Sequence, residues 1–202
     1  MPTDVLTVDD VSYGFVPDHP LFEGATLRLA AGRSLALVGP SGVGKSTLLR
    51  ICAGLISPWR GTVRPPPAHE VAWVHQTTNV FPTRSVADNI RVAQLAVGVE
   101  GAAADDRAGR ALERVGLADR AGQRARTLSG GERQRLCIAR ALATDPACVY
   151  ADEPTGQLDR VTSESIADTL LGLTESGASL LLVTHDLDFA ARCDDVLDLG
   201  HA

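Results

Sequence analysis

A glycine-rich segment at residues 39–46 constrains the fold of this chain more than any other feature. It reads Gly39-Pro40-Ser41-Gly42-Val43-Gly44-Lys45-Ser46 and fits the pattern G-x-x-x-x-G-K-[ST] at every fixed position. An apolar run at residues 34–38 precedes it, and helix-forming residues follow from Lys45, so we expect a buried strand, a loop and a helix. This order is typical of a loop that binds phosphate groups.

The residue types of this loop suit phosphate chemistry. Its three glycines lack the Cβ atoms that would keep backbone N–H groups away from an anion. The following helix offers free N–H groups and the positive end of its dipole. We expect Lys45 to bind the terminal phosphates, the Ser46 hydroxyl to ligate Mg²⁺, and Thr47 to add a phosphate hydrogen bond. The flanking strand and helix argue against a chance glycine-rich turn.

A second strand candidate, at residues 148–151, ends in two carboxylates, Asp152 and Glu153. Asp152 at the end of a buried strand would reach the phosphate site and hold Mg²⁺ directly or through water. Glu153 would orient and deprotonate a water molecule, which a hydrolase needs and a small-molecule kinase does not. Solvated acids at a strand end are the alternative, which the phosphate loop disfavours.

Residues 128–135 read L-S-G-G-E-R-Q-R and open a helix that continues through Leu142. Ser129, Gly130 and Gly131 would present a hydroxyl and N–H groups at the helix N-terminus, which makes a second anion-binding device. A capped helix start without a ligand is the alternative. The segment resembles the signature motif of the ATP-binding cassette (ABC) ATPases, and it lies between the phosphate loop and the acidic pair as it does in that family.

Strand-like runs alternate with helical stretches along the chain, which predicts an α/β fold with a mainly parallel sheet. Residues 85–127 have a helical character that the looser Gly98–Asp106 stretch interrupts. The resemblance implies a P-loop NTPase with N-terminal antiparallel strands and a helical subdomain insertion. We expect one ABC ATPase domain over residues 1–202. Its nucleotide-binding core would span about 1–84 and 145–202, and its helical subdomain about 85–144.

The resemblance also assigns roles to isolated residues. Gln76 looks like the glutamine that contacts Mg²⁺ or the attacking water and joins the core to the helical part. Asp159 resembles the aspartate at the seam of the dimer, and His185 the histidine that touches the γ-phosphate. Phe15 would stack on adenine, with Tyr13 as a packing residue or as the stacking residue in its place. Taken alone, each of these could be an ordinary surface or core residue.

The function that the resemblance implies is that of an ATPase subunit of an ABC transporter. It would bind ATP and Mg²⁺, pair head to tail with a second ABC ATPase subunit as a homodimer, and drive a transmembrane permease subunit. Residues 77–89, with Phe81 and Pro82, would receive that partner. The subunit would be cytoplasmic and peripheral on the inner face of the cell membrane.

Two other functions remain open: a non-transport ABC ATPase that acts on a membrane partner in cell-envelope remodelling, and one that acts on nucleic acid or the ribosome. The run from Asp152 to Asp159 is similar to the DEPTGNLD of the lipoprotein-release and macrolide-export group, with Gln157 in place of Asn.

The composition narrows these choices. A formal net charge of -6 disfavours general adhesion to nucleic acid, so no nucleic acid partner is expected. The N-terminus does not resemble a signal peptide, and no apolar run approaches the ~18 residues that span a bilayer. The four cysteines form no CxxC pair, and we expect buried thiols in a reducing compartment. They are Cys52, Cys137, Cys148 and Cys193.

Overall fold

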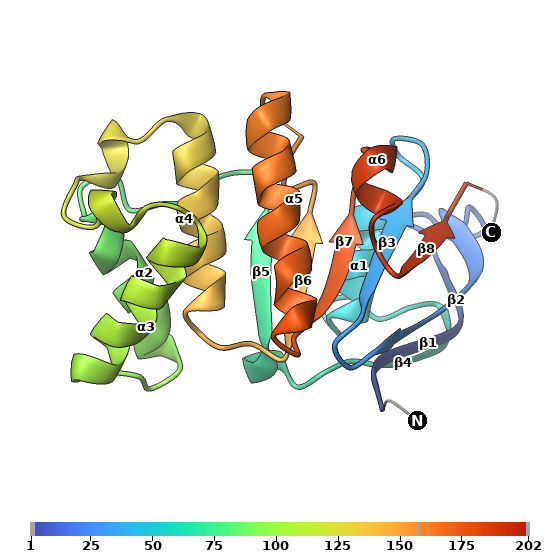
Figure 1. Cartoon of the computed structure of the whole chain (residues 1–202). Helices are drawn as coiled ribbons and strands as arrows, with labels where there is room; N and C mark the ends of the chain where they lie inside the picture. The colour runs from blue at the N-terminus through green and yellow to red at the C-terminus, as the bar shows by residue number, and fades with distance from the viewer. Residues whose placement is uncertain (1–2, 157, 201–202) are drawn as a thin grey trace.

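The computed structural model describes residues 3–156 and 158–200, which form two β-sheets with helices around them (Figure 1). In chain order the strands and α-helices are β1 (Asp4–Tyr13), β2 (Phe22–Ala30), β3 (Ser34–Val38), α1 (Lys45–Cys52), β4 (Arg60–Arg64), β5 (Val71–His75), α2 (Val86–Ala96), α3 (Gly101–Arg114), α4 (Gly130–Leu142), β6 (Cys148–Asp152), α5 (Arg160–Glu175), β7 (Ser179–Val183), α6 (Leu187–Ala190) and β8 (Asp195–Asp198). Short 3₁₀ turns lie at Ala68–Glu70, Ala118–Arg120 and Ala125–Thr127.

The larger sheet is parallel and the smaller one antiparallel. The larger has the order β5-β6-β7-β3-β8, and each pair of neighbours runs in the same direction. The smaller has the order β2-β1-β4. Every residue of β3 and of β7 is buried, and both strands are near-continuous apolar runs because helices or the second sheet cover both faces. The predicted α/β fold with a mainly parallel sheet and N-terminal antiparallel strands is confirmed.

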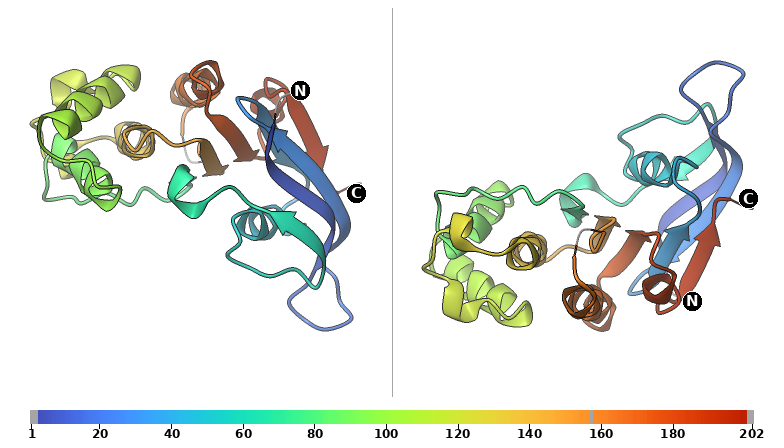
Figure 2. Two further views of the ribbon diagram at one scale, coloured as in Figure 1. Left: turned by 90° about the horizontal axis from the view of Figure 1, so that it is seen from below. Right: turned by 90° about the horizontal axis from the view of Figure 1, so that it is seen from above.

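The molecule is layered around the parallel sheet, as the views from below and above show (Figure 2). Helix α1 lies between the parallel and the antiparallel sheet, while α5 and α6 cover the opposite face. Helices α2, α3 and α4 gather beyond the β5 edge, so they lie far from β3 and β8 (Figure 1). The division of the chain into a core and a helical subdomain stays a prediction.

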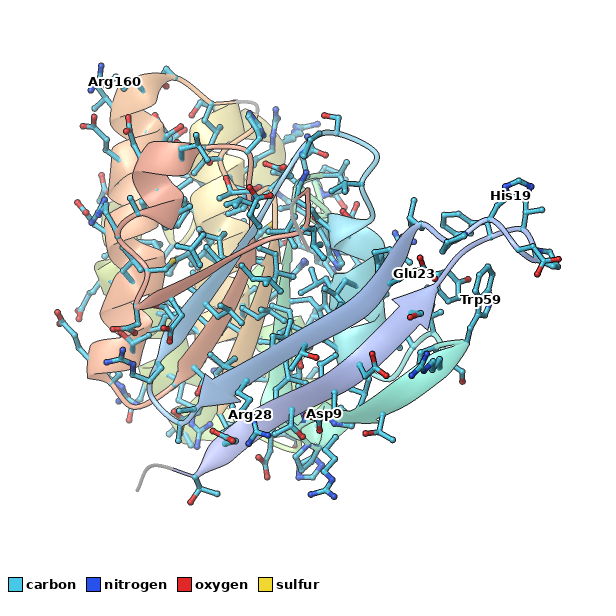
Figure 3. The ribbon with its side chains drawn as sticks, turned by 90° about the vertical axis from the view of Figure 1, so that its right-hand side faces the viewer. Asp9, His19, Glu23, Arg28, Trp59 and Arg160 are labelled. Carbon is cyan, nitrogen blue, oxygen red and sulfur yellow. The ribbon has the colours of Figure 1, made fainter. Side chains whose placement is uncertain are left out.

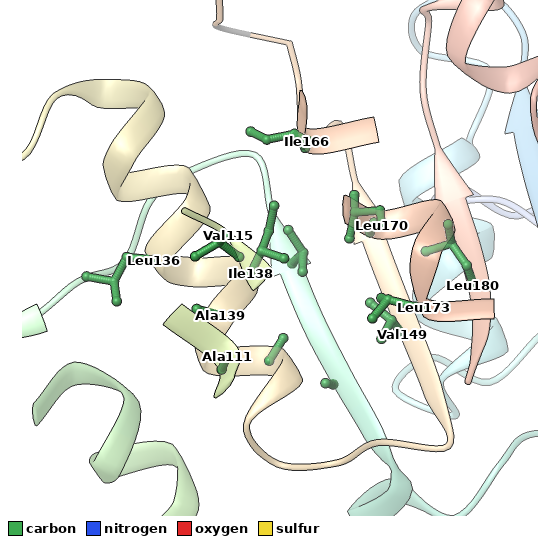
Figure 4. Close-up of a cluster of buried hydrophobic side chains, with 14 of the residues drawn as sticks. Ala111, Val115, Leu136, Ile138, Ala139, Val149, Ile166, Leu170, Leu173 and Leu180 are labelled. Carbon is green, nitrogen blue, oxygen red and sulfur yellow. The ribbon is translucent and has the colours of Figure 1, made fainter. Parts of the chain in front are cut away.

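Two clusters of buried side chains fill the faces of the parallel sheet. Along β6, Val149 points into the cluster under α4 and α5 (Figure 4), and Ala151 belongs to the same cluster. Cys148 and Tyr150 alternate with them and belong to the cluster around α1. The buried Tyr150 hydroxyl donates a hydrogen bond to the carbonyl oxygen of Cys52 at 3.1 Å. An aromatic residue therefore fits this otherwise aliphatic strand, since its polar atom is satisfied.

All four cysteines are buried and free, as predicted. Burial raises the pKa of the Cys52 and Cys148 thiols to about 12, so both stay protonated at neutral pH. They act as small apolar side chains of the core around α1.

Three elements depart from the sequence predictions. The Gly98–Asp106 stretch was predicted to be loose, but α3 begins at Gly101. Its alanines favour helix, and Ala104, Ala108 and Ala111 bury one face of it. Strands β4 and β8 were missed because they lie at sheet edges, where polar residues replace the apolar pattern.

Asp194 joins the segment before β8 to the start of β3. Its carboxylate accepts hydrogen bonds from the Ser34 N–H at 2.8 Å and the Ser34 hydroxyl at 2.9 Å, and it lies 3.2 Å from an Arg33 guanidinium nitrogen. The Ser34 N–H holds the pKa of Asp194 below its ordinary value. A lowered pKa contributes stability that is present above the unfolded-state pKa of about 4 and is lost as pH falls through the folded-state pKa.

Asp194→Asn should therefore lower the free energy of unfolding by about 1 kcal/mol at pH 7, because a charge-assisted hydrogen bond becomes a neutral one. Urea unfolding at pH 7 and at pH 3 measures the difference from the unmodified chain, which should shrink at pH 3. Asp195→Asn, a change at an exposed neighbour, is the control. A difference that is independent of pH would contradict this assignment.

Candidate functional site

The glycine-rich loop connects the end of β3 to the start of α1, as predicted. Gly39, Gly42 and Gly44 have φ angles of 136°, 84° and 108°, which other residues rarely adopt. A Cβ atom on Gly44 would lie 2.7 Å from Phe22 Cδ1, so glycine is also needed there for space. A Cβ atom on Gly39 would lie 3.2 Å from Val43 Cγ1. The loop is therefore held in a conformation that leaves its backbone open to an anion.

Lys45 is folded back into this loop and is only 8% exposed. Its ammonium donates hydrogen bonds to the carbonyl oxygens of Gly39 at 2.8 Å and Pro40 at 3.1 Å. The same Pro40 oxygen accepts a hydrogen bond from the Val43 N–H at 3.4 Å. The positive charge thus lies inside the loop, where it would meet phosphate oxygens.

A groove of about 340 Å³ opens over the loop. It is lined by Phe15, Leu21, Ser41, Gly42, Gly44, Lys45, Ser46, Thr47 and Glu153. A larger cavity of about 630 Å³ lies elsewhere, around α5 and α6, and charged and apolar side chains both line it. The smaller groove is the candidate site, since it alone of the two contains the phosphate loop.

Ser46, which lines the groove, is half of an oxygen pair that suits a hard cation. The Ser46 hydroxyl donates a hydrogen bond to a carboxylate oxygen of Asp152 at 2.9 Å, although the two residues are 106 positions apart. Mg²⁺ prefers oxygen ligands, and carboxylates are its usual protein ligands. The residues present therefore fit Mg²⁺, with Ser46 and Asp152 as the groups that would hold it.

Glu153 lies next to His185. A carboxylate oxygen of Glu153 is 2.7 Å from His185 Nδ1, and the His185 backbone N–H donates to the same oxygen at 3.3 Å. Glu153 has a φ of 48°, a left-handed conformation that costs about 1 kcal/mol or more in a residue with a side chain. Its backbone N–H is fixed to the Val183 carbonyl at 2.9 Å. The turn after β6 thereby aims this carboxylate at the histidine rather than along the sheet.

Gln76 reaches the same place from the end of β5. A Cβ atom on Gly156 would lie 3.4 Å from Gln76 Nε2, 3.6 Å from His185 Cε1 and 3.7 Å from the Glu153 carbonyl oxygen. Because Gly156 has no side chain, these groups can approach one another. The structure thus brings Gln76, Glu153 and His185 together, as the sequence predicted for a shared site.

The predicted signature segment lies away from the groove. Ser129 caps α4, since its hydroxyl accepts from the Glu132 N–H at 3.2 Å and a Glu132 carboxylate oxygen accepts from the Ser129 N–H at 2.7 Å. The Ser129 N–H holds the pKa of Glu132 below its ordinary value. Gly130 is the first residue of α4. Figure 1 shows α5, β6 and β7 between α4 and the loop before α1.

Asp159 is the N-cap of α5 and lies beside the signature segment. Its carboxylate accepts from the Thr162 hydroxyl at 2.7 Å and from the Thr162 N–H at 3.0 Å, which lowers the pKa of Asp159. A Cβ atom on Gly131 would lie 2.7 Å from Thr162 Cγ2, so the two helix N-termini pack closely. Gln157, the substituted position in this run, lies outside the described residues.

Phe15 and Tyr13 take different places. Phe15 lies beyond the end of β1, is 71% exposed and lines the groove. Tyr13 is in β1, and its ring packs against Phe15 and Trp59 with centroids 5.6 Å and 5.8 Å apart. The aromatic ring available to a ligand in the groove is that of Phe15.

Sequence reasoning missed two residues that tie the signature helix to the segment after β5. Gln134 Nε2 donates to the His75 carbonyl oxygen at 3.1 Å, and an Arg140 guanidinium nitrogen donates to the Asn79 carbonyl oxygen at 2.6 Å. These bonds hold both ends of the segment that carries Gln76. No sequence signal could have found them, because the acceptors are backbone atoms 59 and 61 positions away.

Comparisons with known proteins agree on one family. Residues 22–156 match the family described as "ABC transporter". The lipoprotein-releasing system ATP-binding protein LolD of Roseobacter denitrificans is 42% identical over 193 residues, which cover 86% of this chain and 84% of that protein. The uncharacterized ABC transporter ATP-binding protein YbbA of Escherichia coli (strain K12) is 40% identical over 195 residues, which cover 89% and 86%.

Solved structures agree with these relatives. The ATP-binding cassette MJ0796, in a dimeric post-hydrolysis state bound to ADP and Pi, is 28% identical with a TM-score of 0.82 and covers 96% of this chain and 95% of its own. CbiO1 from Clostridium perfringens, part of the ABC transporter complex cbiONQ, is 24% identical with a TM-score of 0.88, which shows the shared fold. It covers 98% of this chain and 86% of its own.

Proposed function

The chain belongs to the ABC transporter family and is an ATP-binding and ATP-hydrolysing subunit. We propose that two copies of it pack head to tail around Mg-ATP and drive a separate membrane-spanning subunit. The observation that carries the proposal is the separation of two anion-binding devices within one chain. The phosphate loop faces the groove, whereas Ser129 caps a helix beyond the β5 edge and does not line it. A second copy is the natural source of a signature segment for this groove.

In this proposal each residue of the groove has one task. The loop N–H groups and Lys45 bind the phosphates, and Phe15 stacks on the base. Bound Mg²⁺, held by Ser46 and Asp152, would supply charge that stabilises the transferring phosphoryl group.

Glu153 acts as the general base in this proposal. Its carboxylate accepts a proton from the water whose oxygen attacks the γ-phosphorus, as the bond to the leaving ADP oxygen breaks. His185 is in contact with Glu153 and would hold its carboxylate and touch the γ-phosphate. Gln76 lies beside Gly156 with His185 and Glu153, where it would contact the water or Mg²⁺. Asp159 would lie at the seam between the two copies.

The segment of residues 77–89 offers a place for the membrane subunit. The buried Asn89 accepts a hydrogen bond from the Phe81 N–H at 2.7 Å and donates to the Phe81 carbonyl oxygen at 3.1 Å. Phe81 itself is 46% exposed. A shaped loop with an exposed aromatic side chain suits a docking site. In this proposal the chain works at the membrane through this partner. No helix in residues 3–156 and 158–200 is long and apolar enough to cross a bilayer.

The names of the relatives point to lipoprotein release as the class of transport, and we extend it to this chain as part of the proposal. Co-purification tests it. The tagged chain, expressed in cells that encode a candidate multi-span partner, should retain that partner, and Phe81→Asp should release it. Recovery of DNA or ribosomes in place of a membrane protein would favour the nucleic-acid alternative.

Ser129→Arg separates the two anion-binding devices. The substitution should abolish ATP hydrolysis, because an arginine at the α4 N-terminus fills the space that the nucleotide of a facing copy needs. The ATP affinity of the isolated monomer should stay within about twofold, since Ser129 does not line the groove of its own chain. Phosphate release measures the rate of ATP hydrolysis, and calorimetry measures the Kd for ATP. If the substitution lowered ATP affinity as much as it lowered hydrolysis, a site built from two copies would be contradicted.

A further inference from the structure

Three aromatic rings lie in a row at the projecting end of the antiparallel sheet. The ring centroids of Phe15 and Tyr13 are 5.6 Å apart with the planes at 87°, and those of Tyr13 and Trp59 are 5.8 Å apart with the planes at 39°. Figure 3 shows Trp59 beside the hairpin whose tip carries His19. The row therefore runs from a residue just before β4, across β1, to the groove over the phosphate loop.

Trp59 is anchored more firmly than its 47% exposure suggests. Its backbone N–H donates to the Ser12 carbonyl oxygen at 2.9 Å. A Cβ atom on Gly14 would lie 2.5 Å from the Trp59 ring and 2.3 Å from the His19 carbonyl oxygen, so the indole lies directly on the chain between Tyr13 and Phe15. The Tyr13 carbonyl oxygen in turn accepts from the Leu21 N–H at 2.7 Å.

Phe15 has no comparable anchor of its own. Its side chain is 71% exposed, and in the described part of the chain its one ring-to-ring contact is the T-shaped pair with Tyr13. An exposed side chain that must become fixed when it binds a ligand loses rotamer freedom at that moment. A ring that is already held in its binding orientation loses less, which raises affinity without adding a contact to the ligand.

We propose that Trp59, acting through Tyr13, is a positioning residue that holds the Phe15 ring ready to stack on the nucleobase. The inference rests on the proposed function, in which Phe15 is the base-stacking residue of the groove. Trp59 does not line the groove, so its effect reaches the ligand through the neighbouring ring. The effect is confined to ligands that carry a base.

This restriction gives the test. Binding of ATP and of inorganic tripolyphosphate is measured by calorimetry for the full chain and its variants. Trp59→Ala should raise the Kd for ATP about 3- to 10-fold, the loss expected for one aromatic pair, and leave the Kd for tripolyphosphate within about twofold. Trp59→Phe should restore most of the ATP affinity. Leu95→Ala, which removes an exposed apolar side chain on α2, is the control and should change neither.

Two further variants separate the inference from the proposed function. Phe15→Ala should raise the Kd for ATP about 5- to 150-fold, the range for loss of a base-stacking aromatic. If it has no effect, base stacking by Phe15 is wrong, and the inference falls with it. If Phe15→Ala weakens ATP binding and Trp59→Ala does not, the inference alone is overturned. Equal weakening of ATP and tripolyphosphate in Trp59→Ala would also overturn it, because Trp59 would then support the whole fold.

A double-mutant cycle tests the route through Tyr13. In the Tyr13→Ala background the Trp59 ring has lost its neighbour, so the added change Trp59→Ala should raise the Kd for ATP by less than about twofold. Full additivity of the two changes would show that Trp59 acts by another route, which would overturn the inference.

Discussion

Glu153→Gln should lower ATP turnover about 10²- to 10⁴-fold while ATP binding stays unchanged, the range by which a positioned general base accelerates a reaction. Glutamine keeps the size of the side chain and one acceptor oxygen, but it cannot take a proton from water. The contact with His185 at 2.7 Å can persist through an amide, so the fold around the groove should be preserved. Single-turnover phosphate release separates this chemical step from binding and product release.

The matched control for this change is Glu113→Gln, at an exposed position of α3. It removes the same charge from the molecule away from the groove and should leave turnover unaltered. Turnover near that of the unmodified chain in Glu153→Gln would show that another group takes the proton, and it would remove Glu153 from the proposed mechanism.

Lys45→Ala should weaken ATP binding by at least about 100-fold, since the ammonium forms several charge-assisted hydrogen bonds that are worth about 1.5–3 kcal/mol each. Lys45 lies inside the loop, only 8% exposed, and its present acceptors are backbone carbonyls of that loop. Removal of the side chain leaves those carbonyls facing the phosphates without a cation. Calorimetry with ATP measures the loss, and an unchanged affinity would contradict the assignment of the loop.

A chemical test of the same residue uses the composition of the chain. Lys45 is the only lysine in the sequence, so a reagent that acylates side-chain amines has one target. Saturating ATP should slow acylation of Lys45, as followed by mass spectrometry, because the phosphates would cover the ammonium. Acylation at the same rate with and without ATP would place the nucleotide elsewhere.

The local features of the site could be predicted from the sequence, because each depends on neighbouring residues. The strand, loop and helix at residues 34–52 follow from an apolar run, from glycines that permit positive φ angles, and from helix formers. The resemblance to ABC ATPases, and to the lipoprotein-release group among them, is confirmed by the family match and the relatives. The roles of the individual site residues stay predictions.

The features that the sequence did not reveal depend on contacts between distant residues. Strand β4 is polar and exists because it pairs with β1. Gln134 bonds to a backbone carbonyl, which any residue type at position 75 would offer. Trp59 meets Tyr13 only because Gly14 leaves room for the indole. Periodicity and motif spacing carry no information about such pairs.

The central claim is that one nucleotide site is built from two copies of the chain, and the oligomeric state measures it most directly. Sedimentation velocity of Glu153→Gln should show monomers without nucleotide and dimers with ATP, since ATP is then bound but not hydrolysed. The double variant Glu153→Gln with Ser129→Arg should still bind ATP and remain monomeric. If Glu153→Gln stays monomeric at saturating ATP, a site built from two copies is contradicted. The same holds if the double variant dimerises as well as Glu153→Gln does.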